Sequence, residues 1–458
     1  MAGAAFPPLA GAQTYGSAGS KSGRRSKTVS SEEYLSVNER ECYADDWQQT
    51  APDLVVYLPK TPRGSDGYAD HFLVDWTPGG DLLAIWTQSG IEGSDDFQVV
   101  FCRSQDEGRS WTRPQQLAPA EFGFPVISRT GRIYCLFNRN KGICDGGFRA
   151  TAVLGCKYSD DDGRTWIDSG IEIDYGRTKY DHPDPKVPCN CIIWQKPVRD
   201  AKDRPMATVT HGSSRELFPL SAPTSWGVRY GDRGGQLMRF DNIDDGPDPR
   251  DLNITWLPKG GDLIRCPINP AVEPEHSRGY SCFHEPSVAP LPDGRLFLAA
   301  SSVSGHLLYT VSEDPDGESW RQPEPLRYLD NGAKLLHPVA PAPFYKLEDG
   351  RFLIFYHGHD GTKHGGLSPR DMRGRRPTCM AVGHYKPDAH QPIWFSQPIQ
   401  LCDTHGVGVG PGELVWLANY ASLTERDGKR VFWYPDRKHF LLGRYITDEM
   451  LADMAVPQ

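Results

Sequence analysis

Ser104-Gln-Asp-Glu-Gly-Arg-Ser-Trp111 is the most informative stretch of this chain, because its pattern S-x-D-x-G-x-x-W occurs three times. The second copy is Ser159-Asp-Asp-Asp-Gly-Arg-Thr-Trp166, and the third, with one inserted residue, is Ser312-Glu-Asp-Pro-Asp-Gly-Glu-Ser-Trp320. In a tight turn, Ser and Asp side chains accept hydrogen bonds from backbone N–H groups, glycine adopts a positive φ, and tryptophan fills the gap between sheets. The motif therefore predicts the same strand–turn–strand unit at three places.

The spacing of the three copies indicates a repeated structural unit. The first two begin 55 residues apart, and the second and third begin 153 residues apart, which is three times 51. A unit of about 50 residues is the length expected of a four-stranded propeller blade. Hairpin-like turns between apolar segments mark the same units, at residues 78–81, 129–132, 292–295, 348–351 and 426–429.

Short segments rich in β-branched and aromatic residues follow these turns, and we expect each to be a strand: residues 82–86, 133–137, 296–300, 352–356 and 431–434. No long stretch shows the periodicity of a helix, although residues 446–454 fit one short helix. The 458 residues include 47 Gly, 39 Pro and 12 Trp, a composition typical of a turn-rich all-β protein.

These patterns predict a single β-propeller domain over residues 46–458. About 400 residues suffice for six blades, with seven tighter blades as the alternative. Residues 1–45 differ, because they are rich in Gly, Ala, Ser and basic residues and contain few large apolar ones. We expect this segment to be a disordered tail.

Charge and hydropathy exclude several classes of function. The formal net charge of −9 argues against nucleic acid as a partner. We expect no membrane span, because no apolar run is long enough. We also expect no secretion signal, since residues 2–12 are short and interrupted by two prolines. The eleven cysteines are odd in number and lack the spacing of a disulfide scaffold, so we expect a cytoplasmic protein.

The sequence predicts no cofactor and no metal ligands. Cys189-Asn-Cys191 is a single C-x-C motif, for which packing in a strand or loop is favoured over metal binding. A second group of potential ligands, His357, His359 and His364, has no helix or strand to fix its spacing. A calcium ion held by propeller carbonyls and Asp side chains is left open.

Candidate site residues are sought where the inner strands of a propeller converge. Four segments place titratable side chains on or beside such strands: residues 68–75 with His71, 91–96 with Asp95 and Asp96, 282–289 with His284 and Glu285, and 419–423 with Tyr420. Any single one of these groups has a structural alternative, in which it hydrogen-bonds a neighbouring blade. That alternative is a poor explanation for all four together.

The chain resembles the sialidase superfamily of Asp-box propellers over roughly residues 54–447. Members use a Tyr nucleophile from a late blade, a Glu that partners it, an Asp acid/base in a loop before the first box, and three Arg that bind the substrate carboxylate. The resemblance assigns these roles to Tyr420 in Tyr-Ala-Ser-Leu, to Glu285 before Pro-Ser-Val-Ala-Pro-Leu-Pro-Asp-Gly-Arg, and to Asp95 or Asp96. A Glu can deprotonate Tyr, and a phenolate is repelled less by an anionic sugar than a carboxylate is.

The first blade departs from the sialidase pattern. Sialidases begin this blade with Arg-Ile-Pro, whereas the corresponding strand here carries His71, which cannot make the bidentate fork of Arg. The run His71-Phe-Leu-Val, with Trp86-Thr-Gln-Ser, Glu92-Gly and Phe101-Cys-Arg-Ser104, is similar to propeller lyases that cut L-rhamnose from D-glucuronate. In that branch His71 would match one active-site histidine and Arg149 the arginine, while a second histidine, expected near residues 95–98, is missing.

The lyase chemistry requires a neutralised uronate and a base. Arg or a cation bound to the carboxylate acidifies the C5 proton, a histidine removes it, and the C4 oxygen leaves. Candidate substrate-binding histidines lie at apparent strand ends: His182, His284, His337 and His357. The basic, Gly-rich stretch 363–377 is interpreted either as a lid that supplies Arg375 or Arg376 to an anionic substrate, or as a solvated loop.

We expect an exo-acting enzyme that cleaves a terminal glycosidic bond next to an acidic sugar. The favoured reaction is β-elimination at a glucuronate, releasing rhamnose or a similar sugar, and the alternative is a sialidase-type retaining hydrolase. A non-catalytic glycan-binding propeller is the third hypothesis. It would require an apolar or neutral floor, whereas the candidates predict a floor rich in His, Arg, Asp and Glu. The expected partner is an oligosaccharide with an acidic sugar, trimmed in the cytoplasm after import.

Overall fold

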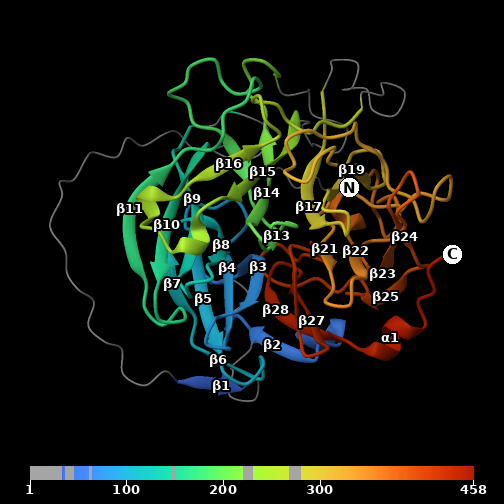
Figure 1. The fold of residues 1–458 in the computed structure, drawn as a ribbon. Coiled ribbons are helices and arrows are strands. Elements are labelled where there is room, and N and C mark those ends of the chain that lie inside the picture. Colours follow the sequence, from blue (N-terminus) through green and yellow to red (C-terminus); the bar gives the residue numbers. More distant parts are fainter. Residues whose placement is uncertain are drawn as a thin grey trace, which may run out of the picture. The chain divides into compact units, whose positions relative to one another are not determined.

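The computed structural model describes residues 33–36, 46–60, 64–143, 145, 151–219, 231–267 and 280–458. The chain divides into two compact units, Met1–Glu33 and Tyr34–Gln458, and the second unit contains the architecture that follows. Within the described residues, its strands form six sheets of four or five strands and one two-stranded sheet. The six sheets succeed one another around a ring in chain order, from blue through green and yellow to red (Figure 1).

The first three blades run from the innermost strand outward. Blade 1 contains β3 (Tyr68–Trp76), β4 (Leu82–Ser89), β5 (Gln98–Ser104) and β7 (Gln115–Ala118). Blade 2 contains β8 (Glu121–Ile127), β9 (Ile133–Asn140), β10 (Ala152–Ser159) and β11 (Ile167–Ile173). Blade 3 contains β12 (Asn190–Ile192), β14 (Pro205–Gly212), β15 (Arg233–Phe240) and β16 (Ile254–Leu257), with β13 (Val198–Arg199) also paired to β14.

The last three blades repeat this antiparallel order. Blade 4 contains β17 (His284–Pro290), β18 (Leu296–Ser301), β19 (Leu308–Val311) and β20 (Glu324–Pro325). Blade 5 contains β21 (Phe344–Lys346), β22 (Phe352–Tyr356), β23 (Thr378–Tyr385) and β24 (Ile393–Phe395), with β25 (Ile399–Cys402) also paired to β23. Blade 6 contains β26 (Ser422–Arg426), β27 (Lys429–Asp436), β28 (Phe440–Ile446) and β2 (Leu54–Tyr57).

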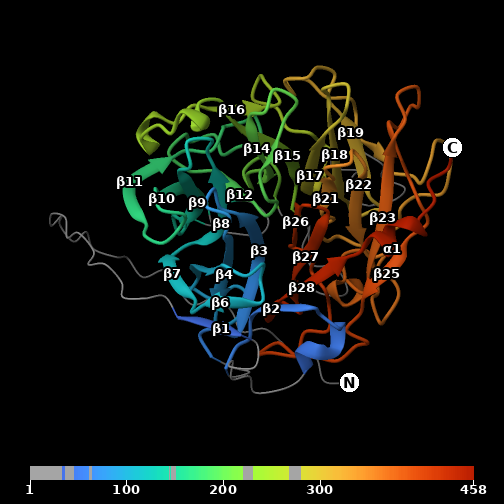
Figure 2. The same ribbon diagram turned by 60° about the horizontal axis from the view of Figure 1, so that its bottom comes forward.

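The outer strand of blade 6 closes the ring, because it comes from the other end of the unit. β2 pairs with β28 through Leu54 opposite Gly443 and Val55 opposite Leu442. Both ribbon views show β2 beside β28, where the blue and red parts of the chain meet (Figures 1 and 2). Closure of this kind builds blade 6 from both ends of the unit, so that the segment preceding blade 1 completes the last blade.

Shorter elements complete the description. β1 (Tyr34–Ser36) pairs with β6 (Ser110–Thr112) in the two-stranded sheet. The short 3-10 helices among the described residues are Asp46–Thr50, Ile243–Asp245, Pro249–Asp251 and Met372–Gly374, and α1 is Asp448–Ala452. Among the described residues, none of the helices has the length and apolar character that a membrane span requires.

The three S-x-D-x-G-x-x-W motifs form the turns that follow the third strands of blades 1, 2 and 4. In the first, Ser104 Oγ accepts from Gly108 N at 2.8 Å, and Asp106 Oδ1 accepts from Ser110 N at 2.8 Å. Trp111 Nε1 donates to the Gly108 carbonyl at 2.9 Å, and Gly108 has a φ of 90°. Equivalent Asp and Trp bonds recur in residues 159–166 and 312–320. The predicted hydrogen bonding of Asp and the positive φ of Gly are confirmed in all three copies, whereas Ser312 accepts from Leu296 N on the neighbouring strand rather than from the turn.

Three inner strands share a bulge at their beginning. His71 on β3, Phe122 on β8 and Glu285 on β17 each have a φ between 50° and 55°. At each of them the register of the first strand against the second shifts. A bulge turns a side chain away from its ordinary alternation, and a left-handed non-Gly residue costs of order 1 kcal/mol or more. The recurrence places three strained residues at corresponding positions around the ring.

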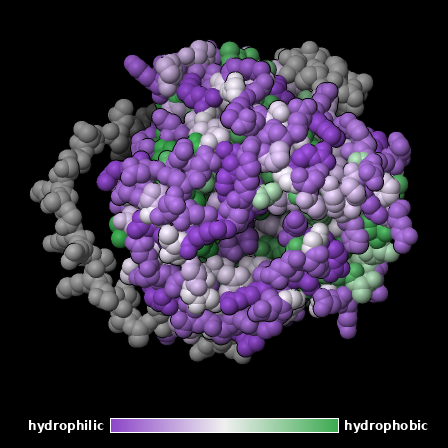
Figure 3. All heavy atoms as spheres, in the orientation of Figure 1, coloured by the Kyte–Doolittle hydropathy of each residue, from purple (hydrophilic) through white to green (hydrophobic). Residues whose placement is uncertain are grey.

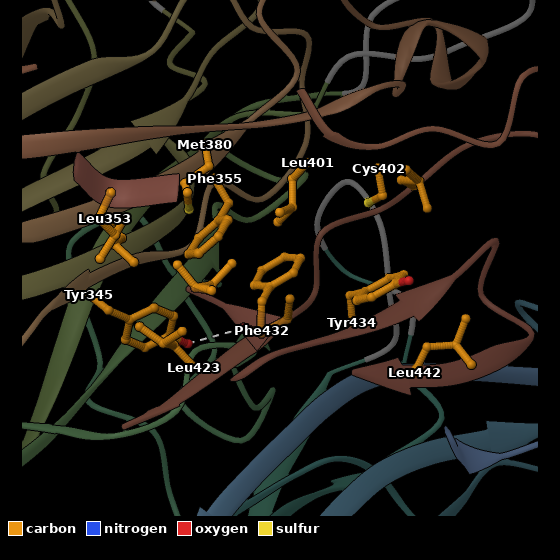
Figure 4. Close-up of a cluster of buried hydrophobic side chains, with 14 of the residues drawn as sticks. Tyr345, Leu353, Phe355, Met380, Leu401, Cys402, Leu423, Phe432, Tyr434 and Leu442 are labelled. Atoms are coloured by element: carbon orange, nitrogen blue, oxygen red, sulfur yellow. Dashed lines mark hydrogen bonds between the residues drawn. The ribbon is translucent and has the colours of Figure 1, made fainter. Parts of the chain in front are cut away.

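Apolar side chains fill the spaces between blades. Between blades 5 and 6, the Phe355 and Phe432 rings stack with centroids 4.1 Å apart. The Tyr345 hydroxyl in the same cluster donates to the Ala421 carbonyl at 3.1 Å (Figure 4). Each fully buried aromatic contributes about 1.5–3 kcal/mol by leaving water. The molecular face seen in the orientation of Figure 1 is, by contrast, mainly hydrophilic (Figure 3).

The six-bladed, all-β propeller predicted from the sequence is confirmed. Each of the five expected strands lies within a strand of the structure, and the expected short helix contains α1. Of the segment expected to be a tail, residues 1–45, the structure describes Glu33 and β1. The remaining residues of that segment lie outside the described ranges.

Candidate active site

The strand order of the blades brings two kinds of segment to one end of the ring, which we call the mouth. These are the beginnings of the first strands and the connections from the second to the third strand of each blade. The Asp-boxes, which connect third strands to the strands that follow, are at the opposite end. Titratable side chains at the mouth are therefore the candidates for chemistry.

Tyr420 and Glu285 meet at the mouth. Tyr420 lies two residues before β26, and its hydroxyl donates a hydrogen bond to Glu285 Oε1 at the start of β17. Both residues are buried, and Glu285 is only 1% exposed. Glu285 Oε2 has no hydrogen-bond partner in the described part of the chain. The neighbouring His284 Nε2 is 3.4 Å from Glu285 Oε1.

Burial controls the protonation of these three groups. It raises the pKa of Glu285 above the ordinary value of 4.5, with the charge of Arg375 and the bond from Tyr420 opposing the shift. Burial and the Glu285 charge raise the pKa of Tyr420 well above its usual range. Burial, aided by Arg233 and Arg375, lowers the pKa of His284 well below its usual range. At neutral pH the imidazole is therefore neutral, and Tyr420 loses its proton only if a base takes it.

A buried ion pair lies beside Tyr420. Lys438, in the connection between β27 and β28, is 3.0 Å from Asp70 Oδ2 and 2.8 Å from Glu92 Oε1. Burial raises the pKa of Asp70, whereas the Lys438 charge opposes that rise. Burial tends to lower the pKa of Lys438, but Asp70 and Glu92 outweigh it and raise the pKa. The Lys438 ammonium is also 5.0 Å from the centre of the Tyr420 ring.

Aromatic rings fix the position of Tyr420. The His71 ring centroid is 4.4 Å from that of Tyr420 and 4.3 Å from that of Phe122, to which it is perpendicular. Trp194 packs edge-on against Tyr420, with centroids 6.2 Å apart. Two of the three bulged residues, His71 and Phe122, therefore belong to the aromatic rings around Tyr420, and the third, Glu285, accepts its hydrogen bond.

Arg375 supplies positive charge to the whole group. It lies in the second-to-third-strand connection of blade 5 and is 7% exposed, and its Nε has no partner among the described residues. Its charge contributes to the pKa of Glu285, Tyr420, His284 and Lys438. Arg375 and Arg376 are buried, whereas residues 363–365, Leu367, Met372 and Arg373 of the stretch 363–377 are exposed, so its role as a lid or as a solvated loop stays a prediction.

The remaining candidate residues occupy several places. His337 and His357 stack with centroids 5.1 Å apart, and burial lowers the pKa of His337 to about 3. Arg376 is buried, with its Nε 3.4 Å from Asp403 Oδ1. His182 lies in the connection before β12, where its Nδ1 accepts from Asp184 N at 3.0 Å.

The structure brings together four of the residues singled out in the sequence: His71, His284, Glu285 and Tyr420. Asp95 is exposed in the connection between β4 and β5, in which Glu92 rather than Asp95 reaches Lys438. Arg149 lies outside the described residues. His359 uses both ring nitrogens in bonds to the Arg376 carbonyl and the Gly361 N–H, so neither is available to a metal ion.

Sequence reasoning missed Asp70, Lys438, Arg233 and Trp194. Asp70 carried a usable signal, because an acidic residue adjoins His71 inside an apolar strand. Lys438 can be placed at the mouth once the strand order is known, because it lies in a connection from a second to a third strand. Trp194 and Arg233 carried no local signal, since their roles depend on how blade 3 packs against blades 4 and 6.

A second cluster of chemistry-bearing residues lies on the mouth side of blade 3. Asp181, Cys189 and His211 are all buried, and one donor atom of each lies within 4.8 Å of the others. The sequence had favoured packing for Cys189, but Asp181 and His211 are distant in sequence from each other and converge only in the fold. Cys191, the cross-strand partner of His211, adjoins them.

Comparison with known proteins identifies the architecture. The family model described as "BNR repeat-like domain" matches residues 80–435. The Hadza microbial sialidase Hz136 is 14% identical, with a TM-score of 0.54 over 86% of this chain and 69% of that one. The leech intramolecular trans-sialidase is 12% identical, with a TM-score of 0.53 over 84% and 69%.

A third structure belongs to a different kind of enzyme. The GH93 α-L-arabinofuranosidase of Fusarium graminearum is 11% identical, with a TM-score of 0.50 over 89% of this chain and 99% of that one. A search of curated protein sequences found no match. At these identities the solved structures show a common fold.

Proposed function

This chain belongs to the family of BNR repeat-like domains, and from its mouth we propose that it is a retaining glycoside hydrolase acting on a terminal acidic sugar. The observation that carries the proposal is the hydrogen bond from the Tyr420 hydroxyl to the Glu285 carboxylate. A nucleophile, a base in contact with it and a cationic surrounding are the parts that this reaction needs.

The residues account for the first half of the reaction. Glu285 accepts the hydroxyl proton of Tyr420, and the phenolate oxygen attacks the anomeric carbon as the bond to the leaving oxygen breaks. The leaving oxygen takes a proton from a carboxylic acid. Asp70, whose pKa is raised by burial, and Asp95, in the exposed connection of the same blade, are the two candidates for this acid.

The second half reverses these roles. Water attacks the anomeric carbon of the glycosyl–Tyr420 intermediate, the acid that protonated the leaving group now accepts the water proton, and Glu285 returns its proton to Tyr420. Two inversions at one carbon retain the anomeric configuration. The cycle returns Tyr420 to its neutral phenol, which burial favours, and Glu285 to its carboxylate, which the charge of Arg375 and the hydrogen bond from Tyr420 stabilise against burial.

The charges at the mouth support an anionic substrate. Arg375 is buried at the mouth, and its positive charge lowers the cost of forming a phenolate at Tyr420, whereas Lys438, 5.0 Å from the Tyr420 ring, is paired with Asp70 and Glu92. Lys438 pairs with Asp70, the residue before His71 on the strand where the sialidase pattern has an arginine. Two of the similar structures are a sialidase and a trans-sialidase, which makes a terminal sialic acid the first substrate to test.

Elimination at a glucuronate is the second candidate. The observation in its favour is His71, whose ring lies against Tyr420 at the site. A neutral imidazole there would remove the C5 proton while a cation neutralised the uronate carboxylate. This reaction, which the sequence alone favoured, gives no role to the contact between Tyr420 and Glu285, and for that reason we place it second.

One experiment separates the two. The pure protein is incubated with a fluorogenic sialic acid glycoside and, in parallel, with rhamnosyl-glucuronate oligosaccharides whose unsaturated product absorbs in the ultraviolet. The proposal expects fluorescence that is lost in Tyr420→Phe. Absorbance that is lost in His71→Ala would overturn it in favour of elimination, and silence on every acidic glycoside tried would favour a binding propeller.

We also propose a cytoplasmic location. The cysteines in the described part of the chain are buried, and the eleven of the sequence lack the spacing of a disulfide scaffold, which suits a reducing compartment. Fractionation of the source cells, with the protein followed by antibody, tests this proposal. Recovery of the protein in the secreted fraction would contradict it.

A further inference from the structure

The cluster formed by Asp181, Cys189 and His211 contains the donor types that a transition metal prefers. His211 is at the end of β14, Cys189 immediately precedes β12, and Asp181 lies in the connection between β11 and β12. All three are buried, and their donor atoms lie within 4.8 Å of one another. Donor atoms around tetrahedral zinc are separated by about 3.3–3.8 Å, so the side chains would have to rotate to bind an ion, and His211 Nε2 and Asp181 Oδ1, which are 2.7 Å apart, would have to separate.

The hydrogen bonds of Gln236 define the state of the His211 ring. Gln236 Nε2 donates to the Gly176 carbonyl at 2.9 Å, which leaves its Oε1 to accept from His211 Nδ1 at 3.0 Å. His211 Nδ1 therefore carries hydrogen. His211 Nε2, whose lone pair remains in a neutral ring, is 2.7 Å from Asp181 Oδ1. Two lone pairs at this distance repel, so a proton lies between the two atoms, and a zinc ion could take its place only if they moved apart to about 3.3 Å.

Hydrogen bonds from neighbouring residues fix the orientation of His211 and Asp181, as hydrogen bonds to metal ligands do in metal sites. The Gln236 amide fixes the ring orientation of His211, and Asp181 Oδ2 accepts from Thr178 N at 2.6 Å and Thr178 Oγ1 at 3.1 Å. These bonds leave Asp181 Oδ1 and His211 Nε2 facing the same point, beside the Cys189 thiol. Outer hydrogen bonds of this kind are typical of zinc ligands.

We propose that Asp181, Cys189 and His211 bind one zinc ion in blade 3. A thiolate, an imidazole and a carboxylate form a mixed set that suits zinc better than calcium or magnesium, which prefer oxygen ligands. Three protein ligands leave a fourth position for water or for the adjoining Cys191 thiol. This site is separate from Tyr420 and Glu285 and does not depend on the reaction proposed for them.

Binding of the ion would release protons. The ion replaces the proton of the Cys189 thiol and the proton shared by His211 and Asp181, so two protons pass to solvent for each ion bound. No oxidation or reduction is involved. The bound ion would cross-link the connection before β12 to the end of β14, next to Thr210, whose hydroxyl accepts from the Glu285 backbone N–H at 2.7 Å.

The competing explanation is a buried ion pair of His211 and Asp181 with packed thiols around it. The two explanations differ in one measurable respect, which is the metal content. The test uses the full chain, purified without chelator or affinity metal, and measures zinc by plasma mass spectrometry. The zinc is then removed, and cobalt(II) is added as a spectroscopic probe.

We expect about one zinc per chain, and a thiolate-to-cobalt charge-transfer band after exchange. Cys189→Ser and His211→Gln should each lower the zinc content at least tenfold. Cys156→Ser is the matched control, because Cys156 is a buried thiol of the same apolar cluster outside the site, and it should retain the metal. Zinc should raise the unfolding temperature of the metal-free wild type and leave that of Cys189→Ser unchanged.

Zinc-free wild type that shows no thiolate band with cobalt(II) would overturn the proposal. A band of undiminished intensity in Cys189→Ser would do the same, since Cys189 would then not be a ligand. If Cys189→Ser does not fold, the wild-type spectrum still decides, because only a cysteine ligand gives a charge-transfer band of this kind. Loss of glycosidase activity has no bearing on these readouts, so this proposal and the proposed function fail independently.

Discussion

The Tyr420 hydroxyl donates a hydrogen bond to the Glu285 carboxylate, although 135 residues separate the two in the chain. Tyr420 begins blade 6 and Glu285 begins blade 4, so only the closed ring of blades brings them together. Both are buried, and Glu285 has a φ of 50° in a bulge of β17. A strained, buried carboxylate in contact with a phenol is costly to the fold, which is typical of a site under functional constraint.

Removal of the phenol oxygen should abolish turnover while preserving the fold. Tyr420→Phe should lower kcat by roughly 10³-fold or more, and Glu285→Gln should lower it by about 10²–10⁴-fold. Tyr434→Phe is the control, because it loses one buried hydrogen bond, to Thr50 at 2.9 Å, away from the site. Steady-state kinetics on the best acidic glycoside check this prediction. Equal losses in Tyr420→Phe and Tyr434→Phe would mean that Tyr420 is only structural.

Lys438 and Asp70 should be strongly coupled in stability. Lys438→Met leaves the buried Asp70 carboxylate without its nearest cation, and should lower the free energy of unfolding by about 3 kcal/mol. Adding Asp70→Asn removes the uncompensated charge, so the double variant should be more stable than Lys438→Met alone. Urea denaturation of the wild type, both single variants and the double variant measures the coupling. Purely additive effects would contradict the importance of this pair.

The free energy of unfolding should decrease as pH is lowered, in part because of His337. Its pKa, lowered by burial to about 3, lies below the ordinary value of 6.5, so the unfolded chain binds a proton between these values and the folded chain does not. The contribution is fully present above 6.5 and is lost as pH falls toward 3, at up to about 1.4 kcal/mol per pH unit. His337→Asn should therefore show a shallower loss of unfolding free energy than the wild type between pH about 6.5 and about 5. Parallel curves would show that His337 is protonated in the folded protein.

The third Asp-box should contribute stability through charge as well as through its turn. Asp316 accepts from Lys202 at 2.8 Å and from Arg204 at 2.6 Å, and these bonds lower its pKa from 3.8 to about 2. Because the site is partly exposed, Asp316→Asn should cost only about 0.5–1 kcal/mol at neutral pH. The cost should shrink as pH falls below 3.8 and vanish below about 2, where the carboxylate is protonated in both states.

A matched variant isolates that effect. Glu318→Gln removes an exposed carboxylate of the same turn, which pairs with Lys259, and should change the unfolding free energy by less than about 0.5 kcal/mol. Thermal or chemical denaturation of the two variants, at neutral and at acid pH, makes the comparison. An equal cost in Glu318→Gln would mean that the bonds of Asp316 to Lys202 and Arg204 have no special weight.

The sequence predicted the fold well because its signals are local. A turn such as residues 104–111 contains its own donors, acceptors and glycine, so its structure can be inferred without knowing the rest of the chain. Tyr420 and Glu285 could be singled out because each stands at the start of a recognisable inner strand. Their contact could not be inferred, since it depends on the number of blades that close the ring.

Other parts of the site could not be predicted from the sequence either, because they too depend on contacts that form only in the folded chain. Lys438 reaches Asp70 from the far end of the chain, and only the pairing of β2 with β28 places blade 6 beside blade 1. Asp181 and His211 are 30 residues apart and meet through the fold of blade 3. Asp95 remains a prediction for the acid, and Arg149 lies outside the described residues.

The most direct test of the central claim is to trap the glycosyl–enzyme intermediate. The wild type is mixed with an activated sialic acid that carries fluorine beside the anomeric carbon, which slows hydrolysis of the intermediate. The protein is then digested and examined by peptide mass spectrometry. The account predicts one sugar adduct per chain on the Tyr420 oxygen, absent in Tyr420→Phe and present in Tyr434→Phe. An adduct on another residue, or turnover that inverts the anomeric configuration, would contradict it.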